Sequence, residues 1–471
     1  GEPTFIIVQF DGPDDEMNPQ NWSLTKKICT TLLALSSGIA GAWASGNDST
    51  IIPQAKEAFG VSDVTESLST GLYLVAFGLG ALFSGPFSET IGRNPVYIIT
   101  LVLFGICIMI AGLAPNIGVQ LAFRFLAGWF GCTAITIFAG SVADLWPPTQ
   151  RVLVLSLTCG LNFCAVFISP VVGAFIGQSS ASWRWTEWIS LIITGASTAS
   201  IFFFAPETYG PQILSWKAAI LRKETRNTHF RSNHELKLEP LSRRLYRSTW
   251  RPFDMLVHEL SIVLFTIYLS VLYIVAFTFL TGYTYIFGDI YHMSQGAVGL
   301  CFLSLVVGII VAGAISVPLH FHYNHNLRIA KSKGQSHLPA EDRLWFAIIT
   351  APCLPIALFW MAWTLYHSIS FWSSLVASSL VGIAFLGIFI ASYLYMIDTF
   401  DSFAGSALAI GAVIRYVAAG AMIPVSIPMY ENLGVHWTLT LLGCISLILT
   451  PVPFVMWKFG YAIRKRSRAA S

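Results

Sequence analysis

Long apolar runs separated by short polar stretches dominate this chain. Twelve of the runs approach or exceed the length of about 20 residues that a helix needs to cross the roughly 30 Å apolar core of a bilayer. The first six runs are 28–51, 68–87, 96–113, 117–142, 152–176 and 185–205. The second six are 260–287, 297–319, 344–365, 372–397, 403–427 and 437–456. The pattern predicts an all-α membrane protein with twelve transmembrane helices.

A single long polar stretch, 206–259, interrupts the series after the sixth run. It separates the runs into two sets, and we expect two six-helix bundles, the first over 28–205 and the second over 260–457. The segments 1–27, 206–259 and 458–471 are predicted to be a cytoplasmic N-terminal segment, a cytoplasmic linker and a basic cytoplasmic tail. Two halves joined by a polar loop are typical of transporters built from repeats around a site near the middle of the membrane.

The distribution of lysine and arginine predicts which side of the membrane each loop faces. Of the 471 residues 55% are hydrophobic and only 11% are charged, whereas an ordinary soluble domain is about 25% charged. With the N-terminus inside, the predicted cytoplasmic segments hold 23 of the 27 basic residues, as the positive-inside rule requires. We therefore expect both termini in the cytoplasm, and the net charge of +3 does not indicate a nucleic-acid partner.

Residue types that hold metals, cofactors or phosphates do not form a recognisable motif. The eight cysteines fall inside or at the edge of apolar runs without a CxxC pair, which indicates small packing residues. His320, His322 and His325 follow the eighth run without neighbouring acids, so we interpret them as solvated. A Gly-rich phosphate-binding loop is also lacking from the sequence. We expect no metal, no cofactor and no enzymatic chemistry.

The loop between the second and third runs carries a motif that hydropathy alone does not explain. It reads SGPFSETIGRNPVYIIT over 84–100 and places Glu89 and Arg93 in a predicted cytoplasmic turn. In letters and placement it resembles the signature of the major facilitator superfamily. Glu89 stands where that family usually has aspartate, and Thr90 where it often has a base. This variant is similar to the fungal twelve-span drug:proton antiporter branch, which contains multidrug exporters.

Three further stretches are similar to motifs of the same branch. RFLAG at 124–128 resembles its buried-arginine motif, and APETYGP at 205–211 resembles the end of its sixth span. The fifth run resembles its antiporter motif, with serine in place of the first glycine, through Ser169, Pro170 and Gly173. The resemblance implies the major facilitator fold and the export of lipophilic drugs, fungicides or toxins in exchange for protons.

The fifth run also has a physical interpretation that does not depend on the resemblance. Small residues recur every four positions, at Ala165, Ser169, Gly173 and Gly177, on one face of a helix that Pro170 bends. Such a face lets two membrane helices approach closely. Plain helix packing and a seal against proton leak are both compatible with the pattern.

Two ionisable residues of the first half are candidates for proton coupling. Asp48 lies near the outer end of the first run and Arg124 about 10 Å from the outer end of the fourth, so their depths are comparable. Charges within spans are costly and indicate function. We predict an Asp48–Arg124 contact, direct or through water, which substrate binding weakens so that Asp48 takes up a proton. In the alternative, the first span ends earlier and Asp48 is solvated outside.

Charged residues at the predicted cytoplasmic ends of the spans form a second candidate group. The resemblance implies that those of the first half clasp the two halves together when the cavity faces outward. The members are Glu89, Arg93, Asp144 and Arg151 in the first half and Arg343, Asp398 and Asp401 in the second. An exposed ion pair contributes only about 0 to 1 kcal/mol, a bias suited to two states of similar free energy.

Aromatic and polar residues in four runs are candidates for lining a substrate cavity. Rings recur at four-residue spacing in the seventh and tenth runs, which suits stacking on flat lipophilic substrates. Arg415, near the middle of the eleventh run, has no acidic partner in its own run and is a candidate for holding an anionic substrate. The full set is Asn162, Phe279, Tyr283, Phe287, Phe385, Phe389, Tyr393 and Arg415. Packing against lipid or within the bundle is the alternative.

We therefore expect a proton-coupled antiporter that exports lipophilic small molecules by alternating access. A dedicated exporter of one metabolite, such as an organic acid, a polyamine or a mycotoxin, is the alternative. For a non-transporting membrane sensor we would expect a large folded tail or clustered catalytic residues, and this sequence shows neither. The expected partners are a small-molecule substrate, protons and the lipid bilayer, with a monomer in the plasma membrane or, alternatively, the vacuolar membrane.

Overall fold

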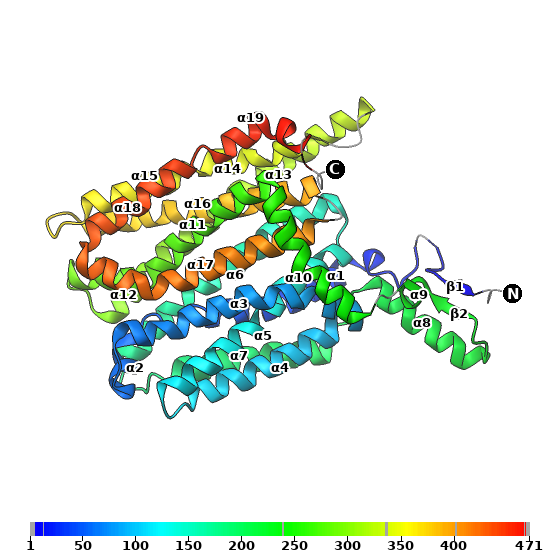
Figure 1. Cartoon of the computed structure of the whole chain (residues 1–471), viewed down its shortest axis with the longest axis horizontal. Coiled ribbons are helices and arrows are strands. Elements are labelled where there is room, and N and C mark those ends of the chain that lie inside the picture. The colour runs from blue at the N-terminus through cyan, green and yellow to red at the C-terminus, as the bar shows by residue number, and fades with distance from the viewer. Residues whose placement is uncertain are drawn as a thin grey trace.

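The computed structural model describes residues 5–12, 14–237, 240–334, 338–400, 403–465 and 467. Long helices run side by side through the body of the molecule (Figure 1). Both ends of the chain lie at one end of this bundle, together with the segment that links the two halves. We call this end the linker end and the opposite end the far end.

The N-terminal half contains six long helices, in the lower part of Figure 1. Their bounds are α1 Leu24–Ala44, α3 Asp63–Ile91, α4 Arg93–Gly112, α5 Ile117–Leu145, α6 Pro148–Gln178 and α7 Trp185–Phe204. A short helix, α2 (Ile52–Phe59), lies at the far end between α1 and α3. Polar caps fix some helix starts: the Asn116 side chain accepts a hydrogen bond from the amide of Val119 at 3.0 Å, at the beginning of α5.

The C-terminal half also forms six spans, but several of them consist of successive shorter helices. Their bounds are α11 Leu260–Tyr283 with η2 Thr284–Asp289, α12 Gln295–Cys301 with α13 Leu303–Ser332, η3 Ala340–Leu344 with α14 Trp345–Thr350 and α15 Cys353–Thr364, α16 Phe371–Phe400, α17 Ala404–Asn432, and α18 Gly434–Leu449 with α19 Val452–Arg464. Pro352 and Pro451 stand at two of the breaks, where proline interrupts the helical hydrogen bonds.

The helices agree with the predicted spans. Eleven helical segments in the described part of the chain are long and apolar enough to cross a membrane. The twelfth span is α1, whose 21 residues pack against α5, α6 and α7 and extend about 31 Å. The predicted all-α membrane architecture is therefore confirmed.

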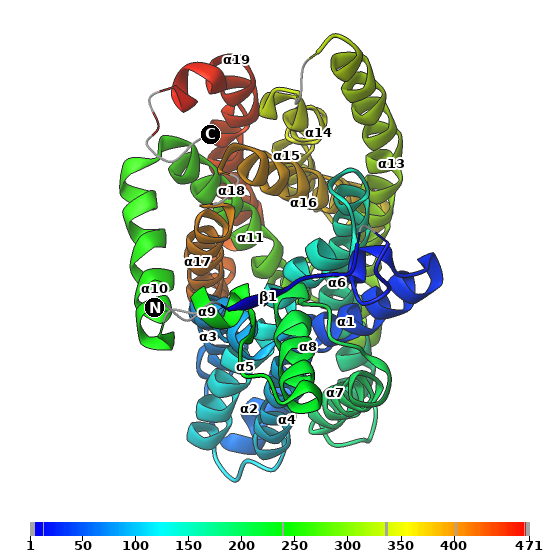
Figure 2. The same ribbon diagram turned by 90° about the vertical axis from the view of Figure 1, so that its right-hand side faces the viewer.

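The two halves meet along α3 against α17 and along α6 against α12 and α13. Seen from the linker end, the C-terminal half lies above the N-terminal half (Figure 2). Glycine allows the closest approach, because a β-carbon added at Gly71 would lie only 2.7 Å from the carbonyl oxygen of Gly420. Contact between backbones through small residues is typical of helix pairs in membranes.

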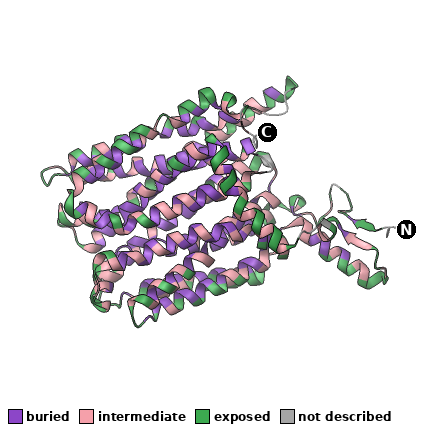
Figure 3. Ribbon diagram, viewed as in Figure 1, coloured by how far each residue is buried: buried purple, intermediate pink, exposed green. Residues whose placement is uncertain are grey.

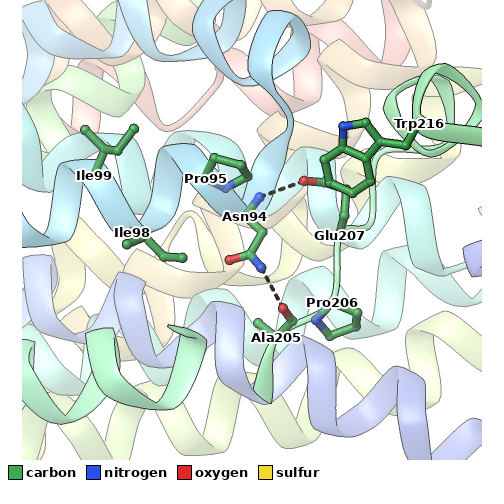
Figure 4. Close-up of a pocket in the computed structure, with 8 residues that line it drawn as sticks. All are labelled: Asn94, Pro95, Ile98, Ile99, Ala205, Pro206, Glu207 and Trp216. Atoms are coloured by element: carbon green, nitrogen blue, oxygen red, sulfur yellow. Dashed lines mark hydrogen bonds between the residues drawn. The ribbon is translucent and has the colours of Figure 1, made fainter. Parts of the chain in front are cut away.

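The turn between α3 and α4 is braced by the segment that follows α7. Gly92 adopts a φ of +109°, which suits glycine. Glu207 accepts hydrogen bonds from the amides of Arg93 at 3.0 Å and Asn94 at 3.1 Å, and the Asn94 side chain donates to the Ala205 carbonyl at 2.6 Å (Figure 4). The Glu207 carboxylate thus accepts hydrogen bonds from the first amides of α4, and its negative charge is attracted to the positive end of the α4 helix dipole. A hollow of about 480 Å³ lies beside this contact.

The linker contains more regular structure than a loose loop. Its elements are α8 Gly210–Thr225, β2 Phe230–Ser232, α9 Asn233–Lys237 and α10 Leu241–His258, and the N-terminal segment contributes β1 Ile6–Val8 and η1 Pro19–Asn21. The strands β1 and β2 pair in parallel, with Ile6 opposite Phe230, and the sequence analysis did not predict them. Helix α10 lies across the linker end and contacts both α3 and α17, so it touches both halves.

Burial follows this arrangement (Figure 3). Helices in the middle of the bundle, such as α11 and α16, are mostly buried, whereas outer helices expose apolar side chains. At the end of α7, for example, Phe202, Phe203 and Phe204 are 62%, 71% and 73% exposed. Rings on the outside of such a bundle suit contact with lipid.

Candidate functional site

A buried group of charged residues lies among α5, α7 and the turn after α1. Arg124 on α5 is completely buried, and its Nη2 forms ion pairs with Asp48 Oδ2 and, at 2.7 Å, with Glu187 Oε1 on α7. Its Nη1 donates a hydrogen bond to the carbonyl of Ala44, at the end of α1, at 2.9 Å. The guanidinium therefore connects three helices of the N-terminal half.

The turn that carries Asp48 differs from the prediction. The first apolar run predicts a helix as far as residue 51, whereas α1 ends at Ala44. Gly46 and Asn47 favour turns, because they tolerate unusual backbone angles or bond to their own backbone. The turn is nevertheless buried, and Asp48 is only 2% exposed. The alternative in which Asp48 is solvated outside the first span is therefore wrong, and the structure brings Asp48 and Arg124 into contact.

Asn47 holds this turn in place on both sides. Its Oδ1 accepts a hydrogen bond from Arg124 Nη2 at 3.0 Å. Its Nδ2 donates to the carbonyl of Thr186 at 3.2 Å and to Ser190 Oγ at 3.0 Å, both on α7. The amide therefore fixes the spacing between the guanidinium and α7.

A third carboxylate, Glu66 on α3, belongs to the same region. Ser69, one turn further along α3, donates from its Oγ to Asp48 Oδ2 at 3.4 Å. Glu66 is 1% exposed and accepts a hydrogen bond from Gln120 Nε2 at 3.0 Å, while its other oxygen has no partner among the described residues. Asp48 and Glu187 thus share one guanidinium, and Glu66 is buried nearby with only a neutral amide as its partner. Burying an ionised carboxylate without a partner costs several kcal/mol, which gives this group a physical reason to hold protons.

The sequence analysis identified Asp48 and Arg124 but missed Glu66 and Glu187. Both glutamates stand close to the start of an apolar run, where an acid is usually interpreted as the solvated end of a span. Glu187 in fact lies within its run, 185–205. That position could have identified it, because an acid inside a span requires a partner.

The residues of the predicted antiporter motif on α6 pack against the turn after α1. A β-carbon added at Gly173 would lie 2.6 Å from the carbonyl oxygen of Asn47. Thr50 Oγ1, at the end of the turn, donates to the carbonyl of Pro170 at 3.0 Å, and Ser169 is fully buried on the same face. The small side chains of the motif therefore make room for the turn that carries the buried acid.

A cavity of about 610 Å³ lies between the two halves. Its walls come from α1, α3, α5 and α6 on one side and from α11, α16 and α17 on the other, with α10 at the linker end. The lining includes Glu89 and Gly405, which are exposed at the linker end, so the cavity opens there. Gly41 and Ser45 also line it, on either side of Ala44, whose carbonyl binds the buried guanidinium. One stretch of backbone therefore connects the cavity wall to the charged group.

The predicted cavity residues divide into two sets. Those that line the cavity are Asn162, Phe385, Phe389, Tyr393 and Arg415. Those that do not are Phe279, Tyr283 and Phe287, which are fully buried inside the C-terminal half. There Tyr283 stacks on Phe302 at 4.4 Å.

The correction on α11 has a simple geometric cause. The side chains of α11 that line the cavity are Tyr273 and Phe277, which the sequence analysis missed. Four-residue spacing shows that rings share a helix face, but it does not say which neighbour that face meets. Tyr283 donates to Ser378 Oγ at 2.8 Å on α16, so its face is directed into the half rather than toward the cavity.

Arg415 on α17 lies in the cavity wall within a cage of aromatic rings. It is 4% exposed, and its Nη2 donates a hydrogen bond to the hydroxyl of Tyr393 at 2.7 Å. Four rings lie 5.0 to 5.3 Å from the guanidinium carbon, those of Tyr273, Phe389, Tyr393 and Tyr416. Its Nε and Nη1 have no hydrogen-bond partner among the described residues. Cation–π contacts stabilise a desolvated guanidinium but do not satisfy its N–H groups.

The charged residues expected to converge at the linker end lie near one another in the first half, with one direct ion pair among them. Arg93 Nε pairs with Asp144 Oδ2 at 3.1 Å. Glu89 Oε2 instead pairs at 2.6 Å with Arg244 on α10, a partner in the linker that the sequence analysis missed. Arg151 donates to a main-chain carbonyl of α5 at 3.0 Å. Glu89 also lies within electrostatic range of Arg93, and Arg151 of Asp144, so the four residues are neighbours although the direct ion pair among them is Arg93–Asp144.

The second half contributes its own pair at this end. Arg343 Nε pairs with Asp398 Oδ2 at 2.7 Å, whereas Asp401 lies outside the described residues. Both members of this pair belong to the C-terminal half. None of these ion pairs joins the two halves directly, which agrees with a cavity that is open at the linker end.

Neutral amide groups close the far end. Gln54 Nε2 donates to the carbonyl of Gly177 at 2.8 Å and to Gln295 Oε1 at 2.9 Å. The amide of Gly296 donates to Gln178 Oε1 at 2.7 Å. Gln54 and Gln178 belong to the N-terminal half, and Gln295 and Gly296 to the C-terminal half, so the Gln54–Gln295 and Gly296–Gln178 bonds join the halves. The structure is therefore open at the linker end and closed at the far end.

Two helical halves around a cavity that opens at one end define a multi-pass membrane transporter. The chain belongs to the Major Facilitator Superfamily, whose family model matches residues 33–424. The family inferred from the motifs is therefore confirmed.

Fungal transporters are among the similar proteins. The MFS-type transporter kojT of Aspergillus flavus is 53% identical over 466 residues, which cover 99% of this chain and 83% of that protein. The citrinin biosynthesis cluster MFS transporter mrr1 of Monascus ruber is 33% identical, over 99% of this chain and 93% of that protein. A partially occluded inward-open structure of the xylose transporter XylE from E. coli matches 92% of this chain and 98% of that chain, with a TM-score of 0.63 at 16% identity. This last likeness shows the fold alone.

Proposed function

We propose that this transporter exports a small molecule from the cytoplasm in exchange for protons, by exposing one cavity alternately to the two sides of the membrane. In this proposal the linker end faces the cytoplasm, because the segments there hold most of the lysine and arginine. The plasma membrane is the proposed location, and one chain is the working unit. A relative named for a metabolite gene cluster supports a small organic substrate.

The buried charged group carries the proposal of proton coupling. Arg124 can neutralise one carboxylate, yet Asp48, Glu187 and Glu66 are all buried around it. Because each additional buried negative charge is costly, at least one of the three acids is expected to be protonated in part of the cycle. A site that gains and loses protons inside the first half is what proton exchange requires.

The end of α1 supplies a physical link between proton and substrate. Ala44 accepts a hydrogen bond from Arg124, and its near neighbours Gly41 and Ser45 line the cavity. When Asp48 or Glu187 takes up a proton, its attraction for Arg124 weakens, and the turn after α1 is released from α5. A substrate that displaces Gly41 or Ser45 acts on the same contacts, because it moves the Ala44 carbonyl that Arg124 binds. Each ligand then shifts the equilibrium between the two states by its preference for one of them.

The test uses the full chain in lipid vesicles loaded with a fluorescent lipophilic compound. Asp48→Asn and Glu187→Gln keep the size of each side chain but remove its ability to ionise. We expect an imposed proton gradient to accelerate transport by the unaltered chain. The gradient-driven transport rate of each variant is expected to be about tenfold lower than that of the unaltered chain. Glu224→Gln is the matched control, because it makes the same chemical change at an exposed position of α8.

Two outcomes would contradict the coupling. Transport that continues unchanged after a protonophore collapses the gradient would remove the proton from the cycle. Unaltered gradient dependence in both Asp48→Asn and Glu187→Gln would place the proton site elsewhere.

The alternative of a dedicated exporter for one metabolite has support of its own. The 33% identical relative is named for the citrinin biosynthesis cluster. A vesicle assay with unrelated acids, bases and neutral compounds separates the two cases, since a broad exporter moves several classes and a dedicated one moves a single compound. Five arginines line the cavity, which disfavours a polyamine as the cargo.

A further inference from the structure

The charged side chains that line the central cavity are mostly of one sign. They are Glu89, Arg93, Arg244, Arg247, Arg251 and Arg415, five arginines and one glutamate. The glutamate is already paired with Arg244, and Arg93 is paired with Asp144 outside the lining. Clefts lined by one sign of charge concentrate ligands of the opposite sign. The entrance therefore favours anions over cations.

Arg415 lies deeper than the other four arginines, and its surroundings differ from theirs. Its Nη2 donates a hydrogen bond to the Tyr393 hydroxyl, at 2.7 Å. Its Nε and Nη1 are buried without partners. An unsatisfied buried donor is costly, and a guanidinium binds carboxylate-like groups through two adjacent N–H groups. The adjacent N–H pairs of a guanidinium are Nε with Nη2 and Nη1 with Nη2, so an anion that reaches Arg415 through the cavity satisfies one of the unpaired donors together with an N–H group of Nη2.

The wall around Arg415 selects for shape as well as charge. Phe163 on α6 meets Phe385 and Phe389 on α16 edge-on, with centroid distances of 4.7 and 4.9 Å. These rings come from opposite halves and line the same cavity, so they form an apolar contact across the interface in the cavity wall. Asn162, beside Phe163, has an Oδ1 without a partner among the described residues and lines the same cavity. A flat ring that lies against this wall makes stacked or edge contacts that a flexible chain does not make as well.

We propose that the cavity binds a planar aromatic organic anion, with its negatively charged group on Nη2 and either Nε or Nη1 of Arg415 and its ring against Phe163, Phe385 and Phe389. This inference rests on the proposed export function and deepens it by naming the class of cargo. Binding does not need a proton gradient, so the two can be tested apart.

The experiment measures binding to the purified full chain in detergent, using probes of closely matched shape and different charge. They are 2-naphthoate, 2-naphthamide and 2-naphthylmethylammonium, with hexanoate as an anion that lacks the ring. We expect 2-naphthoate to bind about tenfold more tightly than the neutral amide, and the ammonium compound to bind most weakly. Hexanoate is expected to bind more weakly than 2-naphthoate because it cannot stack on the rings.

Substitutions connect this preference to the site. Arg415→Gln is expected to abolish the preference for 2-naphthoate over the amide, and Arg415→Lys to retain only part of it, since lysine lacks the planar fork. Tyr393→Phe keeps the ring and is expected to weaken 2-naphthoate binding several-fold while leaving the amide unchanged. Lys223→Gln, which removes one positive charge from an exposed site on α8, is the control and should change nothing.

The outcomes separate this inference from the proposed function. Equal affinity for 2-naphthoate and 2-naphthamide, no binding of 2-naphthoate at millimolar concentration, or a preference unchanged in both Arg415→Gln and Tyr393→Phe would overturn the anion site. In each of those cases the proposed function, proton-driven export, would remain valid for another compound. Conversely, binding of 2-naphthoate that depends on Arg415, without any gradient-driven transport in vesicles, supports the anion site and contradicts the export function.

Discussion

Arg124 and Arg415 are buried inside spans of this transporter, one in each half, and they differ in what surrounds them. Arg124 is 0% exposed and Arg415 is 4% exposed. Arg124 forms ion pairs with Asp48 and Glu187, and a third buried acid lies close by. Arg415 is surrounded by aromatic rings and one tyrosine hydroxyl, and the described residues place no carboxylate on it.

The comparison teaches that similar burial can serve opposite purposes. A carboxylate is neutralised by taking up a proton, so the charge of the group around Arg124 can change during a transport cycle. An aromatic ring does not change its charge, and Arg415 keeps its positive charge and two unsatisfied donors until a ligand arrives. The difference supports a proton site in the N-terminal half and a substrate site in the C-terminal half.

Replacing each arginine by methionine gives the largest expected difference. Arg124→Met leaves Asp48 and Glu187 without a cation, and we expect the free energy of unfolding to fall by about 3 to 5 kcal/mol, with loss of transport. Arg415→Met leaves no acid unpaired, so only about 1 kcal/mol is expected, from the lost bond to Tyr393. Thermal unfolding of the purified variants in one detergent measures this contrast.

A third methionine variant sets the baseline for that comparison. Arg184→Met removes a hydrogen bond to a main-chain carbonyl at the far end, outside both sites. If Arg124→Met unfolds no more readily than Arg415→Met and Arg184→Met, the buried acids do not depend on Arg124, and the contrast between the two arginines fails.

An intermediate effect is expected from the motif that packs against the proton site. Gly173→Ala adds a β-carbon 2.6 Å from the carbonyl of Asn47, which forces the turn after α1 to move. We expect a loss of about 1 to 3 kcal/mol in stability and a several-fold loss of gradient-driven transport, with binding at Arg415 unchanged. Gly195→Ala on α7 is the control, because an added β-carbon there meets open space. Equal behaviour of the two variants would show that the turn tolerates the displacement.

The smallest effect is expected at the linker end. The Glu89 side chain is 48% exposed, so its ion pair with Arg244 contributes about 0 to 1 kcal/mol. Glu89→Gln is expected to lower the fraction of molecules whose cavity is open at the linker end by at most about fivefold. The native thiol of Cys159 lines the cavity and reports this population through its rate of maleimide labelling, read by peptide mass spectrometry. Labelling that becomes faster, or more than about tenfold slower, would contradict the weak bias assigned to this pair.

The sequence predicts the spans well because apolar length is a local property. Each span needs enough neighbouring apolar residues to cross the bilayer, and this requirement can be counted along the chain. The turn after α1 was wrongly predicted as helix, because its burial depends on partners far away in sequence. Asn47, for example, bonds to Thr186 and Ser190 on α7. Hydropathy counted the buried turn as part of the helix.

The candidate sites were predicted less completely, for two physical reasons. The rings of α11 show a helical period but not the direction in which the face points, so Phe279 and Tyr283 were assigned to a cavity that Tyr273 and Phe277 line. The linker-end pair was missed because Glu89 finds its partner, Arg244, in a segment that sequence reasoning treated as connection only.

The bonds that close the far end have a consequence for the environment in which the transporter can work. Gln54, Gln178 and Gln295 carry no charge at any ordinary pH, and their partners here are amide or carbonyl groups. In the proposed orientation this seal faces the external medium, and neither its acidity nor its salt content changes the strength of such neutral bonds appreciably. Opening of the far end then depends on protonation of the acids buried inside. The transporter therefore responds to external pH through these acids, while external pH does not weaken the seal itself.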